Sequence, residues 1–201
     1  MPVVSRGDQW VDGQAIEDLA RFVNVAWSHR ALIPRELARR VAIILNSAHA
    51  TVALIPDDKL GENLPGRPRP YRQLATHVGD IVEAFLGLVE QGKSHVIADL
   101  DKPVPDHIRT SQDIVAFQAG VLKHFHSWWA KEGEQRDYSV DVDVYYGEQT
   151  LHEYFERTTW HLAQHVRQLQ YALELMGISV PSPLSTADLT GLPMPDNVWD
   201  G

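Results

Sequence analysis

Cysteine is absent from the 201-residue sequence. Its absence excludes disulfide bonds, thiolate metal sites and a cysteine nucleophile, so the protein ligands of any metal must be histidine or carboxylate. The absence is also compatible with a reducing compartment. A chain of this length can bury a sizeable core without disulfide bonds, and we expect one compact domain.

Long apolar runs and an excess of basic residues are also missing. No stretch of about 18 consecutive apolar residues occurs, so we expect no membrane-spanning helix. Residues 1–8 lack the charged and apolar regions of a signal peptide. The 18 basic and 27 acidic side chains give a formal net charge of −9, which argues against binding to nucleic-acid phosphates. We therefore expect a cytoplasmic protein with no nucleic-acid or membrane partner, acting on a small uncharged or cationic substrate.

Apolar residues recur at helical spacing over most of the chain. The spacing predicts a short accessory helix over residues 14–24 and main helices over 34–55, 71–91, 111–131 and 149–176. Thr110 or Ser111 is expected to cap the third main helix, and Gln149 or Thr150 stands at the start of the fourth. Gly92 and Gly177 are typical helix stop residues. The sequence thus predicts an all-α protein in which four main helices form a bundle.

The connections differ in length and composition. Residues 61–70 contain three prolines and two glycines and are predicted to form a loop. Residues 93–110 are long enough for a crossover between the second and third main helices. Valines alternate with Asp141 and Asp143 over residues 140–144, which predicts a short extended segment but is not enough to infer a sheet. The proline-rich tail, residues 179–201, is predicted to wrap the bundle without a regular helix, anchored by Trp199.

The most informative motif is His161-x-x-x-His165 in the last main helix. Residues four apart lie on one face of a helix, one turn above the other, so both imidazoles can reach one metal ion. His77, in the second main helix, is the candidate for a third ligand. Three imidazoles leave coordination positions open for chemistry.

The sequence Trp160-His161-x-x-x-His165, followed by Arg167 and Gln168 in the last long helix, resembles the DinB-like superfamily of bacterial metalloproteins. A histidine in the second helix and a long connection before the third extend the resemblance over residues 34–176. The tail, with Leu192-Pro193 and Trp199, is also similar to family C-termini. The resemblance implies a single DinB-like domain over residues 1–201, with an N-terminal accessory segment (1–33), the main bundle (34–176) and a wrapping tail (177–201).

The resemblance further implies that His77, His161 and His165 bind one divalent metal ion. Zinc is expected, with nickel, iron or manganese as alternatives. The family includes transferases and isomerases that use low-molecular-weight thiols such as bacillithiol or mycothiol, so a thiol and a small electrophile are the implied substrates. A homodimer is possible by family analogy. The accessory segment before Pro34 departs from the minimal family domain.

Several reactions are open to such a site. A thiol bound to the ion would lose its proton more easily and attack an electrophilic carbon, which is S-transfer. The same Lewis acid could polarise a carbonyl or activate water, which leaves a hydrolase as an alternative. A noncatalytic metal-binding, stress-associated bundle is a further alternative. The catalytic residues stay unknown at this stage.

Other polar residues have a weaker claim to the site. Gln168 is expected to face solvent, with a ligand-orienting role as the alternative. Asp80 or Glu83 could accept a hydrogen bond from His77, and carboxylates on an exposed helix face are the equal alternative. His49 is the substitute if His77 is not the third ligand. Solvated or packing roles are expected for the remaining candidates, which are His124, His126, His152, the loop residues Arg67 and Arg69, and the pair Asp141 and Asp143. His29, His95 and His107 lie in predicted connections and receive no role.

Overall fold

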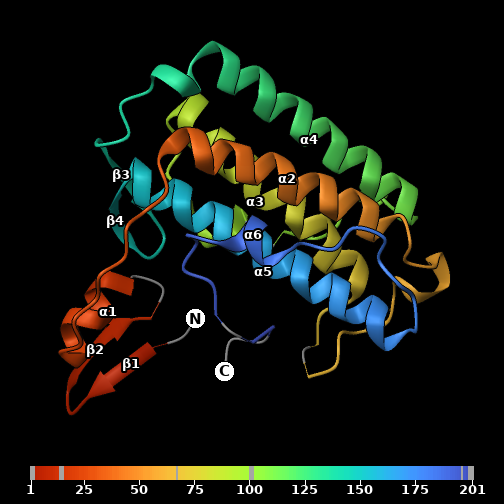
Figure 1. Cartoon of the computed structure of the whole chain (residues 1–201), viewed down its shortest axis with the longest axis horizontal. Helices are drawn as coiled ribbons and strands as arrows, with labels where there is room; N and C mark the ends of the chain where they lie inside the picture. Colours follow the sequence, from red (N-terminus) through yellow and green to blue (C-terminus); the bar gives the residue numbers. More distant parts are fainter. Residues whose placement is uncertain (1–2, 14–15, 67, 100–101, 196, 199–201) are drawn as a thin grey trace.

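The computed structural model describes residues 3–13, 16–66, 68–99, 102–195 and 197–198. Within these ranges the chain is mostly helical and also contains two small antiparallel sheets. Figure 1 shows the long helices lying side by side, with the N-terminal strands and the short helix α1 (Ile16–Val23) projecting from one end. The prediction of a helical fold is confirmed, and the two small sheets were not predicted.

Four long helices lie close to their predicted positions. They are α2 (Pro34–Val52), α3 (Tyr71–Gln91), α4 (Ser111–Lys131) and α5 (Leu151–Leu175). Helix α2 ends at Val52, before the predicted end at Ile55, because the chain turns at residues 53–55 ahead of Pro56. Short 3-10 turns lie in the connections at Asp57–Lys59, Ile97–Asp99 and Gly133–Gln135.

The helix ends follow from local chemistry. Thr110 and Thr150 each accept a hydrogen bond from the backbone N–H three residues later, and the acidic residue at that position accepts one from the threonine backbone. These capping boxes satisfy backbone donors that have no partner within the helix. Gly92 ends α3 with φ of 63°, a left-handed conformation that favours glycine.

The four long helices pack as a closed ring. Helix α5 contacts α2 and α3, and α4 contacts the same two helices from the other side. The core between them is aromatic at one end: the Phe85 ring stacks on Phe155 with centroids 4.7 Å apart, and the edge of Trp128 meets Phe85 at 5.2 Å. Burial of such large side chains contributes about 1.5–3 kcal/mol each, and this core fixes how α3, α4 and α5 lie.

A hairpin precedes α5 where the sequence predicted only an extended segment. Strand β3 (Asp141–Val144) pairs antiparallel with β4 (Gly147–Thr150), in the register Asp141 with Thr150. The chain reverses at Tyr145 and Tyr146, and the next residue, Gly147, has φ of 123°, a conformation that favours glycine. The alternating valines therefore form a strand whose inner face packs on the helices.

The chain ends also contain structure that was not predicted. Near the N-terminus, β1 (Val3–Arg6) and β2 (Gln9–Asp12) form a second hairpin. In the tail, Ser185 caps a one-turn helix, α6 (Thr186–Leu189), which corrects the prediction of no regular helix there. The predicted anchor Trp199 lies outside the described residues.

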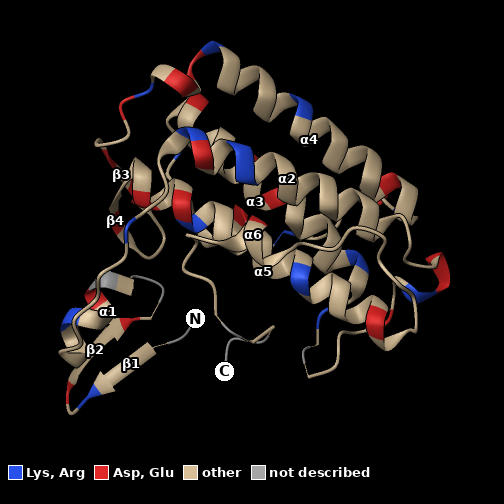
Figure 2. Cartoon of the chain, viewed as in Figure 1, with Lys and Arg blue, Asp and Glu red and all other residues tan. Residues whose placement is uncertain are grey.

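Charged residues of both signs are interspersed along the helices and loops (Figure 2). No helix among the described residues combines the length and apolar character needed to cross a membrane.

Candidate metal centre

Helix α5 places His161 and His165 on one face, as their spacing predicted. Their ring centroids lie 4.7 Å apart, and the two Nε2 atoms are separated by 3.0 Å. His165 is buried and His161 is half-buried. Two ring nitrogens therefore face the same small volume inside the ring of helices.

His77 reaches the same place from α3. Its ring centroid lies 4.9 Å from that of His165 and 5.6 Å from that of His161. One nitrogen from each of the three rings lies within 4.8 Å of the others, an arrangement that could hold a metal ion. Since Phe85 meets Phe155 while His77 meets His161, α3 and α5 run antiparallel, and the histidines lie beyond the aromatic core.

The surroundings favour a neutral imidazole at His161. Burial lowers the pKa of His161 well below its ordinary value, and the neighbouring His165 and Arg157 lower it further. Neutral imidazole is the form that donates a lone pair to a metal. The three imidazole nitrogens form a donor set that could hold a metal ion.

Gln168 contacts the histidine group directly. Its Oε1 lies 2.8 Å from Nδ1 of His165, and its side chain is almost fully buried. The expectation of a solvent-facing amide was therefore wrong. The contact agrees with the alternative, an orienting role, because a partner at one ring nitrogen fixes how a histidine ring lies. Gln168 lies one turn beyond His165, so its side chain points inward like those of the two histidines on α5.

Helix α4 supports α3 on both sides of His77. The buried Gln118 amide donates to the Ala75 carbonyl at 2.8 Å. Two residues after His77, Gly79 lets the Phe117 ring approach so closely that an added Cβ would lie 2.4 Å from its Cε1 atom. The absence of a side chain at residue 79 therefore sets the spacing of the helices beside the site.

Asp80 and Glu83 pair with a lysine, whereas the sequence suggested a hydrogen bond from His77. Both carboxylates pair with Lys102, at 2.9 Å and 3.4 Å from its Nζ atom. Burial raises the pKa of Asp80, and the contact with Lys102 acts against that shift. These residues tie the α3–α4 crossover to α3.

The other histidines do not join the three. His49 lies on α2, where burial lowers its pKa, and it is not part of the group. His152 contacts the Leu32 carbonyl at 2.8 Å, which corrects its expected solvated role. His29 pairs with Glu156 at 2.9 Å, so these two contacts join the N-terminal segment to α5. His124 pairs with Glu90, and His126 and His107 are exposed.

The remaining candidates are two loop arginines and two aspartates, and none of those that the structure describes belongs to the histidine group. Arg67 lies outside the described residues. Arg69 lies near enough to His161 to lower the pKa of that imidazole. Asp141 and Asp143 are exposed on β3, and among the described residues they belong to no group with metal-ligand spacing.

A polar cluster that was not predicted from the sequence lies beside the site. Arg157, one turn before His161, packs over the Tyr146 ring at 4.4 Å and donates to the Tyr145 hydroxyl at 2.9 Å. The Tyr154 hydroxyl contacts Nδ1 of His95 at 2.7 Å. Arg157, His161 and His165 are spaced four residues apart, and this spacing could have indicated that the arginine lies on the same helix face as the two histidines. Nothing local indicated His95, which reaches α5 from the crossover.

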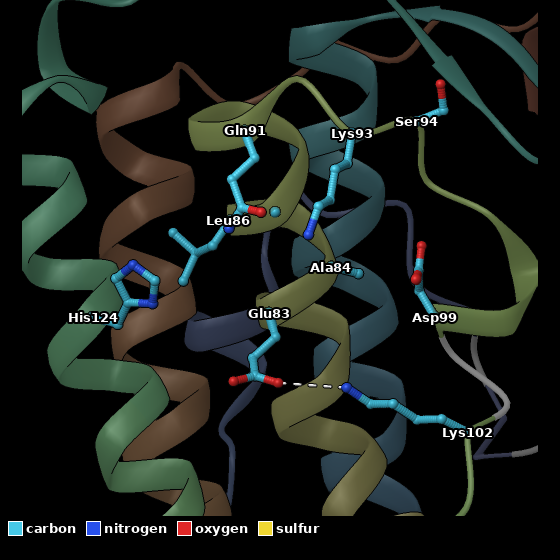
Figure 3. Close-up of a pocket in the computed structure, with 10 residues that line it drawn as sticks. Glu83, Ala84, Leu86, Gln91, Lys93, Ser94, Asp99, Lys102 and His124 are labelled. Carbon is cyan, nitrogen blue, oxygen red and sulfur yellow. Dashed lines mark hydrogen bonds and ion pairs between the residues drawn. The ribbon is translucent and has the colours of Figure 1, made fainter.

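A pocket of about 270 Å³ lies elsewhere, beside the C-terminal half of α3. Glu83 and Lys102 face each other across its lower part, and Lys93, Gln91 and His124 line the rest (Figure 3). None of the three clustered histidines lines it. The pocket and the histidine group are therefore separate features of α3.

No protein-family model, curated protein or solved structure matches the chain.

Proposed function

We propose that the chain is a DinB-like metalloprotein, with its four long helices forming a bundle of that type, and that it transfers a low-molecular-weight thiol to a small electrophile. His77, His161 and His165 would hold one divalent ion, with zinc as the first candidate. The observation that carries the proposal is the convergence of three imidazole nitrogens from two helices within 4.8 Å.

The ion would supply a Lewis acid that lowers the pKa of a thiol or polarises a carbonyl. The protein's part is to hold three neutral ligands and to leave other coordination positions open. Gln168 orients His165, and burial keeps His161 neutral. In the transfer, the thiol would lose its proton to solvent, its sulfur would bond to the electrophilic carbon, and the leaving group would depart with its bonding electrons.

The charge beside the site supports an anionic nucleophile. Arg157 and Arg69 both lie near enough to His161 to lower its pKa, so two cationic side chains act on the site although the chain as a whole is acidic. A positive potential favours a thiolate over a neutral thiol. Arg157 is fixed against Tyr145 and Tyr146 and adds this charge without entering the ligand set.

Metal analysis tests the first part of the proposal. Protein purified without an affinity tag should contain about one ion per chain, and His77→Ala, His161→Ala and His165→Ala should each reduce that content sharply. His124→Ala is the matched control, because His124 is an exposed histidine on α4 that pairs with Glu90. Unchanged metal content in all three folded site variants would reject the site.

Turnover tests the second part. The metal-loaded protein should consume bacillithiol or mycothiol in the presence of an electrophile, and the His161→Ala variant should not. Product formation from water without thiol would indicate a hydrolase. Metal binding without any turnover would indicate a noncatalytic metal-binding protein, and either outcome would overturn the transferase proposal.

A further inference from the structure

We propose that the C-terminal tail is part of the metal centre. The Val198 carbonyl sets the orientation of the Gln168 amide, and that amide holds His165 in the tautomer whose Nε2 can bind a metal. Gln168 is thus a positioning residue that connects the tail to a ligand. The consequence for metal binding rests on the proposed function, whereas the effect on the tautomer does not.

Three side chains of α5 hold the tail against the helix. The Gln164 amide donates to the Val198 carbonyl at 2.6 Å, and the Arg167 guanidinium donates to the Pro195 carbonyl at 2.9 Å. The Gln168 amide donates to the same Val198 carbonyl at 3.3 Å. Residues 164, 167 and 168 flank His165, so the tail docks on the part of α5 that carries the ligand.

The chemistry of these contacts fixes the hydrogen positions. A carbonyl oxygen only accepts, so the NH2 group of Gln168 must face Val198. Its Oε1 then faces His165 at 2.8 Å and can only accept. Nδ1 of His165 must therefore carry the hydrogen, which leaves the lone pair of the neutral ring on Nε2. That Nε2 is the atom 3.0 Å from Nε2 of His161.

Without the Val198 carbonyl, the preference of His165 for the tautomer with hydrogen on Nδ1 becomes weaker. The amide could then turn over and present its NH2 group to Nδ1, which would favour the tautomer with hydrogen on Nε2. That tautomer offers no lone pair at Nε2, the nitrogen that faces His161. The tail contact thus supports the ligand-competent form of His165 through a single buried amide.

Nuclear magnetic resonance of the imidazole nitrogens in metal-free, full-length protein tests the first step. We expect the wild type to hold His165 with hydrogen on Nδ1. The double variant Gln164→Leu/Arg167→Leu, which loosens the tail, should populate the other tautomer. Adding Gln168→Glu should abolish that effect, because a carboxylate only accepts and selects Nδ1–H with or without the tail.

A matched control is available on the same helix. Gln170 donates from its amide to Ser47 Oγ on α2 at 3.0 Å, away from His165, so Gln170→Leu should leave the tautomer unchanged. An unchanged tautomer in the double variant, with tail exchange shown to be faster by amide hydrogen exchange, would overturn the inference.

Zinc titration tests the second step. Competition with a chromophoric chelator should show about fivefold weaker zinc binding in the double variant, the effect of one net hydrogen bond, and little change when Gln168→Glu is added. If the wild type binds no zinc while the tautomer responds to the tail, the proposed metal function fails and the tail contact stands. If zinc binds equally in all variants, the tail has no role in the metal centre.

Discussion

The Tyr154 hydroxyl lies 2.7 Å from Nδ1 of His95, and both side chains are buried between α5 and the α3–α4 crossover. Burial, together with the nearby Arg157, lowers the pKa of His95 to about 4, while Asp99 acts in the opposite direction. The folded protein therefore holds this imidazole neutral at a pH where the unfolded chain would protonate it.

This pair predicts a loss of stability in mild acid. Between about pH 6.5 and pH 4 the unfolded chain binds one more proton at His95, so the free energy of unfolding falls as pH falls. Between pH 7 and pH 5 the contribution is about 2 kcal/mol. Urea unfolding of metal-free wild type and His95→Gln at the two pH values measures it. Equal losses in both proteins would show that His95 does not titrate as described.

Zinc should stabilise the folded chain. An ion that binds the folded state alone, at a free concentration 100 times its dissociation constant, adds about 2.7 kcal/mol to the free energy of unfolding. Thermal unfolding should show that zinc raises the unfolding midpoint of the wild type and leaves that of His77→Ala unchanged. His124→Ala should respond like the wild type. Removing the ion with a chelator should return the wild type to its lower midpoint.

Gly79→Ala should destabilise the protein by about 1–2 kcal/mol, because the new methyl group overlaps the Phe117 ring and the packing of α3 on α4 must change. Gly87→Ala on the same helix is the control. A Cβ there would meet nothing within 4 Å, and the gain in helix propensity should stabilise the protein by about 0.5–1 kcal/mol. Chemical unfolding measures both. A second change, Phe117→Leu, should recover part of the loss at Gly79, and no recovery would place the strain elsewhere.

Thr150→Ala should cost about 1 kcal/mol of stability, because the backbone N–H of Glu153 loses its cap at the start of α5. Thr150→Ser keeps the hydroxyl and should stay close to the wild type. Zinc stoichiometry should not change in either variant, since His161 lies three turns further along the helix. A loss of zinc in Thr150→Ala with the fold intact would mean that the ligands depend on the helix start.

The long helices could be predicted because apolar residues recur at helical spacing along each one. Threonine caps precede α4 and α5, and glycines follow α3 and α5. Helix α3 begins and ends where the sequence predicts, at Tyr71 and Gln91. The β3–β4 hairpin could not be predicted with the same ease, because four alternating residues carry a weak signal and the pairing depends on a two-residue turn at Tyr145 and Tyr146. The N-terminal hairpin is equally short.

The histidine group also has one part that could be predicted from the sequence and one part that could not. The face shared by His161 and His165 follows from helix geometry, and the sequence placed His77 within reach of them. The inward position of Gln168 depends on how α5 is rotated against its neighbours. Its contact with Val198 joins a side chain to a distant backbone carbonyl, for which the sequence has no local signal. The likeness to the DinB superfamily stays a prediction from the motif.

His77 and His161 meet across the interior, although the chain between them contains the crossover, helix α4 and the β3–β4 hairpin. An ion shared by these residues would close that whole stretch into a loop and reduce the conformational entropy of the unfolded chain, as a crosslink does. A protein without cysteine cannot obtain such a crosslink from a disulfide bond. Its histidines would provide one that is reversible and that forms only when the ion is present.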